Sequence, residues 1–337
     1  MKEALLYEKL KECNVKCCLC NHRCIIPPDG RGLCGVRENQ GGTLVSLVYG
    51  RVIAKNIDPI EKKPLFHFYP GSLSYSIATV GCNFRCLFCQ NSDISQMPID
   101  SGVIHGTPYT AQAIVSEALA SGSKSISYTY TEPTVFFEFA YDTAALASEK
   151  GLKNVFVTNG YMTLEAIDHI RPYLNAANVD LKAFDDGFYK KTCKARLSPV
   201  LETLRHMKEL GIHLEITTLL IPDLNDNIAM LKDMAIFIKD SLGTETPWHV
   251  SRFHPRYKLT DRGGTPVELI RKVRKIGVEA GLRYVYTGNI PGDEGENTLC
   301  HACGALLLKR FGFKVSHNII ENGNCPNCKT PVYGVWE

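Results

Sequence analysis

The uneven distribution of cysteine along the chain constrains the fold more than any other sequence feature. All but one of the fourteen cysteines lie in three groups, within residues 13–34, 82–89 and 300–328. Between residues 90 and 299 Cys193 is the only cysteine. Apolar residues make up 45% of the 337 positions and charged residues 22%, which is ordinary for a globular protein. The cysteine groups are therefore local sites added to an otherwise conventional fold.

The cellular compartment decides what these thiols can do. The first twelve residues alternate apolar and charged side chains, unlike a signal peptide. No segment has the ~20 uninterrupted apolar residues that cross a bilayer. We therefore expect a cytoplasmic protein without a membrane segment, where thiols stay reduced and clustered cysteines indicate metal binding or catalysis. The net charge of +3 gives no indication of a nucleic-acid partner.

The section between the second and third groups alternates strand and helix patterns. It predicts strands at 73–80, 125–130, 154–158, 177–181, 212–220, 248–252 and 283–287, and helices at 108–120, 134–150, 163–174, 198–210, 226–240 and 266–280. Such alternation implies right-handed parallel crossovers, and this number of units favours an α/β fold with a partial or complete parallel β/α barrel. We expect three parts: a cysteine-rich N-terminal segment with a metal knuckle and a lid (1–70), the barrel (71–290), and a zinc-ribbon-like segment (291–337).

The second cysteine group lies in the loop after the first predicted barrel strand, where β/α barrels carry their chemistry. Cys82, Cys86 and Cys89 form the spacing CxxxCxxC. Three thiolates from one loop suit a 4Fe–4S cluster and leave one iron without a protein ligand, open to a cofactor or substrate. Zinc is the alternative, but it favours four ligands, and no fourth cysteine or histidine lies nearby in the sequence.

At these residues the chain resembles the radical S-adenosylmethionine (SAM) superfamily, and the resemblance covers residues ~70–290. A closer similarity, to the AmmeMemoRadiSam-system radical SAM enzymes, rests on Asp58–Ser72, Cys86–Asn91 and Ser127–Pro133 together with both outer cysteine groups. The resemblance implies that SAM chelates the open iron. One electron then cleaves SAM and releases a 5′-deoxyadenosyl radical, which abstracts hydrogen from a substrate.

The resemblance also implies roles for single residues. Glu132, in Tyr130-Thr131-Glu132-Pro133, would accept the methionine ammonium of SAM, and Lys182 would contact its carboxylate. The other implied cofactor-binding residues are Phe88 at the adenine, Asn159, Asp180, which orders the Lys182 site, and His249 over the ribose.

Two family segments are altered in this chain. Tyr130 and Thr131 stand where the family has two glycines, and Val157 stands where the related activating enzymes have an aspartate. Ordinary structural roles also fit several candidates: Glu132 as a helix start, Asn159 in a turn, and Asp180 and Lys182 as a strand-end ion pair. A lone histidine such as His249 is more often structural.

The segment Glu61–Pro64 precedes the barrel and carries a run of charges. It predicts either a solvated charged surface or a lid over the barrel mouth.

The outer groups have the spacing of closed metal sites. Cys300, Cys303, Cys325 and Cys328 form two CxxC pairs typical of a zinc ribbon. Cys17, Cys20, Cys24 and Cys34 supply four thiols that hold zinc or a second iron–sulfur cluster equally well by count, and the neighbouring glycines favour zinc. Cys13, Cys18 and Cys193 have no predicted metal role.

The preferred function is a radical SAM enzyme acting on a small molecule, an RNA or a protein. The alternatives are an activase of a glycyl-radical enzyme, like the pyruvate formate-lyase activating enzymes, and a non-catalytic multi-zinc binding module. The resemblance implies an electron donor such as ferredoxin or flavodoxin, and a functional association with AMMECR1-like and Memo-like proteins.

Overall fold

The computed structural model describes residues 1–337, and its centre is an eight-stranded sheet with the order β16-β15-β14-β13-β12-β11-β9-β8. All of its strands are parallel except β8, which pairs antiparallel with β9 at one edge. The strands are β8 (Ala54–Pro59), β9 (Leu73–Ala78), β11 (Ser125–Tyr128), β12 (Lys153–Thr158), β13 (Ala176–Asp180), β14 (His213–Leu220), β15 (Trp248–Arg252) and β16 (Val285–Gly288). The edge strands β8 and β16 do not pair with each other, so the barrel is partial.

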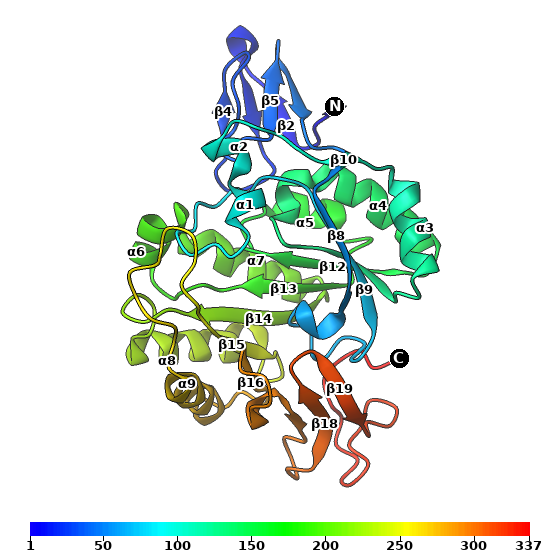
Figure 1. Ribbon diagram of the computed structural model, residues 1–337, viewed down its shortest axis with the longest axis vertical. Coiled ribbons are helices and arrows are strands. Elements are labelled where there is room, and N and C mark those ends of the chain that lie inside the picture. The colour runs from blue at the N-terminus through cyan, green and yellow to red at the C-terminus, as the bar shows by residue number, and fades with distance from the viewer.

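Helices connect successive parallel strands and flank the sheet (Figure 1). The main helices are α3 (Ala111–Ala120), α4 (Phe137–Glu149), α5 (Leu164–Ile170), α7 (Leu197–Glu209), α8 (Ile228–Phe237) and α9 (Val267–Glu279). The short ones are α1 (Ser92–Ser95), α2 (Met97–Asp100), α6 (Asp186–Phe188), the 3-10 turns η1 (Lys11–Cys13), η2 (Ile60–Lys62), η3 (Pro133–Phe136) and η6 (Glu294–Glu296), and the π-helical turns η4 (Tyr189–Cys193) and η5 (Ile238–Leu242). The alternation predicted from the sequence is confirmed.

Small antiparallel sheets lie at the two ends of the long axis (Figure 1). The N-terminal strands are β1 (Lys2–Glu3), β2 (Tyr7–Lys9), β3 (Val15–Cys17), β4 (Ile25–Ile26), β5 (Arg37–Gln40) and β6 (Thr43–Ser46), with β7 (Arg51–Val52) paired to β10 (Thr107–Pro108). The C-terminal sheet contains β17 (Thr298–Leu299), β18 (Leu306–Phe311) and β19 (Lys314–Asn318). None of the helices is long and apolar enough to cross a membrane.

The N-terminal strands share their core with the barrel. One cluster of 67 buried apolar residues includes Val15, Leu19 and Ile26 as well as the interior of the large sheet. Burial of this continuous apolar surface fixes the N-terminal segment on the barrel.

The boundary predicted at residue 70 needs correction. Strand β8 belongs to the large sheet, and the segment that follows it crosses the inner face of that sheet: the amides of Phe66 and His67 donate to Glu215 on β14 at 3.0 and 2.8 Å. The barrel therefore begins near residue 54. Alternation of polar and apolar residues does not reveal β8, because its pairing with β9 decides its conformation.

Candidate active site

A cavity of about 500 Å³ opens at the carboxyl ends of the parallel strands. Its wall contains all three cysteines of the CxxxCxxC loop and most of the residues predicted to bind SAM. These predicted residues are Cys82, Cys86, Phe88, Cys89, Glu132, Asn159, Asp180 and Lys182. Residues from loops far apart in the sequence thus meet in one pocket, as expected for a β/α barrel.

The cysteine loop is held by backbone hydrogen bonds to the π-helical turn η4. The amides of Arg85 and Leu87 donate to the carbonyls of Cys193 and Thr192 at 2.9 and 3.1 Å. The buried Cys193 thiol lies close to Cys86, a neighbour that the sequence did not predict. Burial raises the pKa of the Cys82 thiol well above its ordinary value, and the nearby Glu132 carboxylate adds to the effect.

Glu132 is buried at the beginning of η3, with 2% of its surface exposed. Its Oε1 accepts from the Thr134 amide and hydroxyl at 3.1 and 2.5 Å and from the Thr158 hydroxyl at 2.7 Å. Its Oε2 accepts only from the Asn159 amide, at 2.8 Å. A carboxylate oxygen has two lone pairs, so Oε2 keeps one acceptor position beside the pocket. Burial raises the pKa of Glu132, and these hydrogen bonds oppose the rise.

Asn159 connects Glu132 to the cysteine loop. Its amide nitrogen Nδ2 donates to Asn83 Oδ1 at 2.7 Å and lies 3.8 Å from Cys82 Sγ. Asn159-Gly160 also forms a turn that requires glycine. Gly160 has φ +69°, and a Cβ there would lie 2.7 Å from Val179.

Tyr130 adopts a backbone conformation that glycine reaches without steric cost. Its φ is +63°, in the left-handed region. The Tyr130 hydroxyl donates to Asp58 on β8, and the Asn91 side chain donates to its carbonyl at 2.8 Å. These contacts hold the strained residue in place, so a residue other than glycine is accommodated here.

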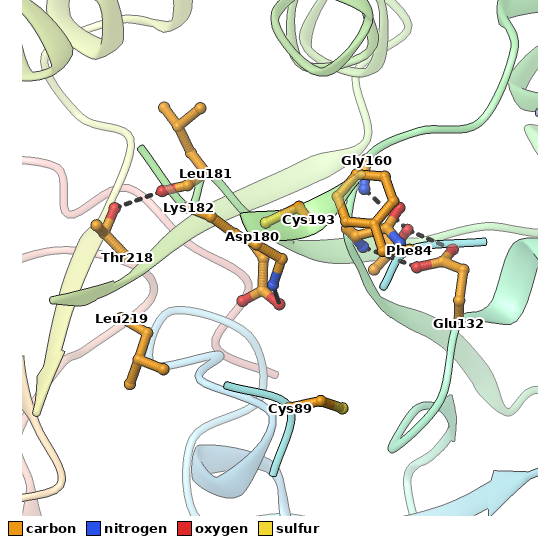
Figure 2. A network of polar contacts seen from close by, with 12 residues as sticks. Phe84, Cys89, Glu132, Gly160, Asp180, Leu181, Lys182, Cys193, Thr218 and Leu219 are labelled. Atoms are coloured by element: carbon orange, nitrogen blue, oxygen red, sulfur yellow. Dashed lines mark hydrogen bonds and ion pairs between the residues drawn. The ribbon is translucent and has the colours of Figure 1, made fainter. Parts of the chain in front are cut away.

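Lys182 and Asp180 form an ion pair at the end of β13, with Nζ and Oδ2 2.8 Å apart. Figure 2 shows this pair beside Cys193, together with the hydrogen bonds of Glu132. The Lys182 ammonium also lies 5.8 Å from the centre of the Phe88 ring. Burial alone would lower the pKa of Lys182, but the charges of Asp180 and Cys86 outweigh it and keep the ammonium protonated.

The charged run at residues 61–64 is partly buried and lines the pocket, while the Lys62 side chain stays 43% exposed. Glu61 and Lys63 are each 1% exposed. Lys63 donates to Asp58 at 2.7 Å, and with Lys62 and Pro64 it forms part of the pocket wall. Burial lowers the pKa of Lys63 to about 8, although the Asp58 partner opposes this change.

His249 does not line the pocket with the other predicted residues. It is 2% exposed, and its Nε2 lies 2.6 Å from Glu215 Oε2, deeper in the barrel than the pocket floor formed by Thr217 and Ser251. The geometry therefore fits a structural role for His249 and not contact with the SAM ribose. The neighbouring Thr217 hydroxyl is buried at the pocket wall without a hydrogen-bond partner. Thr217 carries no local sequence signal, whereas Lys63 belongs to the charged run Glu61–Pro64.

The three cysteine groups differ in geometry. In the C-terminal group the four Sγ atoms lie within 4.8 Å of one another, with Cys300–Cys328 and Cys303–Cys325 separations of 3.6 and 3.7 Å. These separations fit the edges of a tetrahedron around one metal ion with metal–sulfur bonds of about 2.3 Å. Neither the catalytic-loop cysteines nor the N-terminal four form such a compact set.

The pocket residues fit a 4Fe–4S cluster with bound SAM. The loop supplies three thiols around an open space, which suits a cluster with one iron free of protein ligands. The free acceptor position of Glu132 and the Lys182 ammonium match the two charged ends of an amino acid. The unpartnered Thr217 hydroxyl is a further polar contact for a ligand.

Comparison with known proteins agrees with this geometry. The family profile of the Radical SAM superfamily matches residues 76–235. The chain belongs to the Radical SAM superfamily and is an enzyme of that class.

Among individual relatives, an uncharacterized protein of Methanocaldococcus jannaschii is 50% identical over 333 residues, which are 97% of this chain and 98% of the relative. The pyruvate formate-lyase-activating enzyme of Clostridium pasteurianum is 24% identical over 212 residues, covering 58% of this chain and 86% of that enzyme. A solved radical SAM methyltransferase from Sphaerobacter thermophilus shares the fold, with a TM-score of 0.52, 17% identity and 71% of each chain covered.

Proposed function

We propose that this enzyme cleaves SAM reductively and uses the resulting 5′-deoxyadenosyl radical to abstract hydrogen from a substrate. Cys82, Cys86 and Cys89 would hold a 4Fe–4S cluster, which when bound supplies the electron for this cleavage. The observation that carries the proposal is the convergence of these three thiols with Glu132 and Lys182 in one pocket.

The chain's own residues would bind and orient SAM. Glu132 Oε2 accepts the methionine ammonium through its free lone pair, while Oε1 keeps the carboxylate fixed to the neighbouring backbone. Lys182 has three N–H donors, of which Asp180 uses one, so the others can reach the methionine carboxylate. Phe88 offers an aromatic surface for the adenine in the same wall.

Within the superfamily, the segments Asp58–Ser72 and Ser127–Pro133 support membership of the AmmeMemoRadiSam system. Both meet at the pocket, because Tyr130 and Lys63 are joined through Asp58. A ferredoxin or flavodoxin is the proposed electron donor, and AMMECR1-like and Memo-like proteins are the proposed functional associates.

The geometry disfavours a purely structural multi-zinc module. Such a module predicts compact cysteine sets in all three groups, whereas only the C-terminal four converge on a point. An activase of a glycyl-radical enzyme remains compatible with the same pocket, and no contact in the structure favours it over the main proposal.

Electron paramagnetic resonance on anaerobically reconstituted, dithionite-reduced protein tests the proposal. Addition of SAM should shift the g values of the cluster signal, because SAM enters the iron environment. In Glu132→Gln the shift should require a higher SAM concentration, while the exposed control Glu149→Gln should behave like the parent. A parent signal unaffected by saturating SAM would refute SAM binding at this cluster.

A further inference from the structure

The four cysteines Cys17, Cys20, Cys24 and Cys34 surround a small cavity on the N-terminal side of the barrel. Most of its remaining wall is apolar, from residues such as Leu19, Ile26, Leu33 and Val135. We propose that this cavity binds a second iron–sulfur cluster of the 4Fe–4S type, in place of the zinc ion that the glycine-rich sequence favours.

The spacing of the thiols distinguishes the two metals. A single zinc ion needs four sulfurs close together, and the four C-terminal sulfurs lie within 4.8 Å of one another. The N-terminal sulfurs do not form a comparably compact set, and in this they match the catalytic cysteines. Ligands of a 4Fe–4S cluster are spread around a larger body, because each thiolate binds a different iron.

Arg37 supplies an independent indication that an anion belongs in this cavity. It lines the cavity and is only 2% exposed. Its Nη1 donates to Glu138 at 3.0 Å and its Nη2 donates to the Leu5 carbonyl at 3.0 Å, but its Nε has no partner. A buried N–H group without a partner is costly, and metal-bound thiolate sulfurs would accept this hydrogen bond.

The cavity adjoins the catalytic loop. His22, another lining residue, places Nε2 2.8 Å from the carbonyl oxygen of Asn83, which lies between the catalytic ligands Cys82 and Cys86. Gly81, the residue before Cys82, also packs closely against the N-terminal segment. Its φ is +104°, and a Cβ there would lie 2.7 Å from Val36 and 3.4 Å from the Cys34 carbonyl oxygen. A cluster with four protein ligands has no open iron, so its chemistry in this position is electron transfer.

Metal analysis of full-length protein, purified without oxygen from iron-supplemented cells, tests the assignment. The parent should contain about eight iron and one zinc per chain. Replacement of Cys82, Cys86 and Cys89 together by alanine should leave about four iron and an equal amount of acid-labile sulfide. Replacement of Cys20 and Cys24 by alanine should also leave about four iron, whereas the matched control Cys13→Ala with Cys18→Ala should keep all eight.

The proposal is overturned if the variant without catalytic cysteines contains no iron and about two zinc per chain. Anomalous scattering from crystals of the parent at the iron and zinc edges answers the same question without any variant: iron at the N-terminal site supports the proposal, and zinc contradicts it. Both readouts are independent of SAM cleavage, so a failed assignment here leaves the proposed function standing.

Discussion

Glu132 illustrates how single residues around the pocket divide their work. One carboxylate oxygen is saturated by three donors that hold the loop, and the other keeps a position free beside the cysteines. A charge-assisted hydrogen bond to an ammonium contributes about 1.5–3 kcal/mol. Binding of SAM should therefore depend on this residue more than on any exposed acid.

We expect Glu132→Gln to weaken SAM binding by roughly 10- to 100-fold, since the amide keeps the shape of the side chain but loses its charge. Anaerobic calorimetric titration of the reconstituted protein measures the effect. An unchanged dissociation constant for SAM in a folded, cluster-loaded variant would show that Glu132 does not bind SAM.

The raised pKa of Glu132 gives this interaction a pH dependence. The ammonium of SAM binds the ionised carboxylate, and burial makes Glu132 take up a proton at a higher pH than an ordinary glutamate. As the pH is lowered from neutrality, affinity should fall while the pH is still above the ordinary value of 4.5. Measurements of SAM affinity across this pH range should show the loss in the parent and a constant affinity in Glu132→Gln. The same pH dependence in both proteins would show that Glu132 is not the titrating group.

Tyr130 separates backbone strain from side-chain contact. Glycine at this position loses the hydroxyl contact to Asp58 but relieves the left-handed conformation, whereas alanine loses the contact and keeps the strain. We expect Tyr130→Ala to be less stable than Tyr130→Gly by about 1–2 kcal/mol. Urea unfolding of the two variants measures the difference, and equal stabilities would show that the loop relaxes to another path.

At the level of elements, the N-terminal strands are fixed to helix α4 by a buried ion pair. Arg37 on β5 and Glu138 on α4 lie 2.9 Å apart, with side chains 2% and 0% exposed. Glu138 also accepts from the Leu5 amide at 2.8 Å. A buried charge that loses its partner is strongly destabilising, so this pair makes the attachment specific.

Glu138→Met should lower the free energy of unfolding by about 3–5 kcal/mol, because it leaves the Arg37 charge buried and uncompensated. Adding Arg37→Met should recover part of this loss, since the guanidinium left without its carboxylate partner is then removed as well. Chemical denaturation of the single and double variants provides the measurement. A double variant less stable than Glu138→Met would show that the charges are not coupled in this way.

The sequence predicts the strands and helices of the barrel well. It predicts poorly the segment after β8 that crosses the inner face of the sheet. The predicted strand at 212–220 is β14 (His213–Leu220), and that at 154–158 is β12 (Lys153–Thr158), because apolar periodicity is a local signal. The CxxxCxxC loop is found from its cysteine spacing, and Glu132 from the family resemblance of the segment around it. Thr217 is not found, because a single threonine in a strand carries no local signal. The charged run around Lys63 leaves a solvated surface and a lid equally open, because its burial depends on contacts distant in the sequence.

At the scale of the whole molecule, the C-terminal sheet packs beside the open edge of the barrel. Phe66, Tyr284 and Tyr286 form one apolar cluster with Leu307 and Leu308 of β18. The Val335 amide donates to the His67 carbonyl at 2.7 Å, and the Tyr69 amide donates to the Val335 carbonyl at 2.7 Å. The four cysteines between Cys300 and Cys328 therefore lie in the part of the chain that covers this edge.

We expect the parent to bind about one zinc ion at this group, and Cys303→Ser with Cys328→Ser to lose it. The loss should speed amide hydrogen exchange in β17 and β18 and in the adjoining β16, because a segment this small has too little core without its metal. Mass spectrometry of exchange, with Cys13→Ser as the control, measures the change. Unaltered protection after loss of the metal would show that packing alone holds the segment.

The central claim is that the pocket formed around Cys82, Cys86 and Cys89 cleaves SAM. Its most direct test is quantification of 5′-deoxyadenosine after dithionite reduction of the anaerobically reconstituted protein with SAM. The parent should form 5′-deoxyadenosine and methionine in equal amounts, and Cys86→Ala should form neither above background. An intact cluster without cleavage, or cleavage by Cys86→Ala at the parent rate, would contradict the claim.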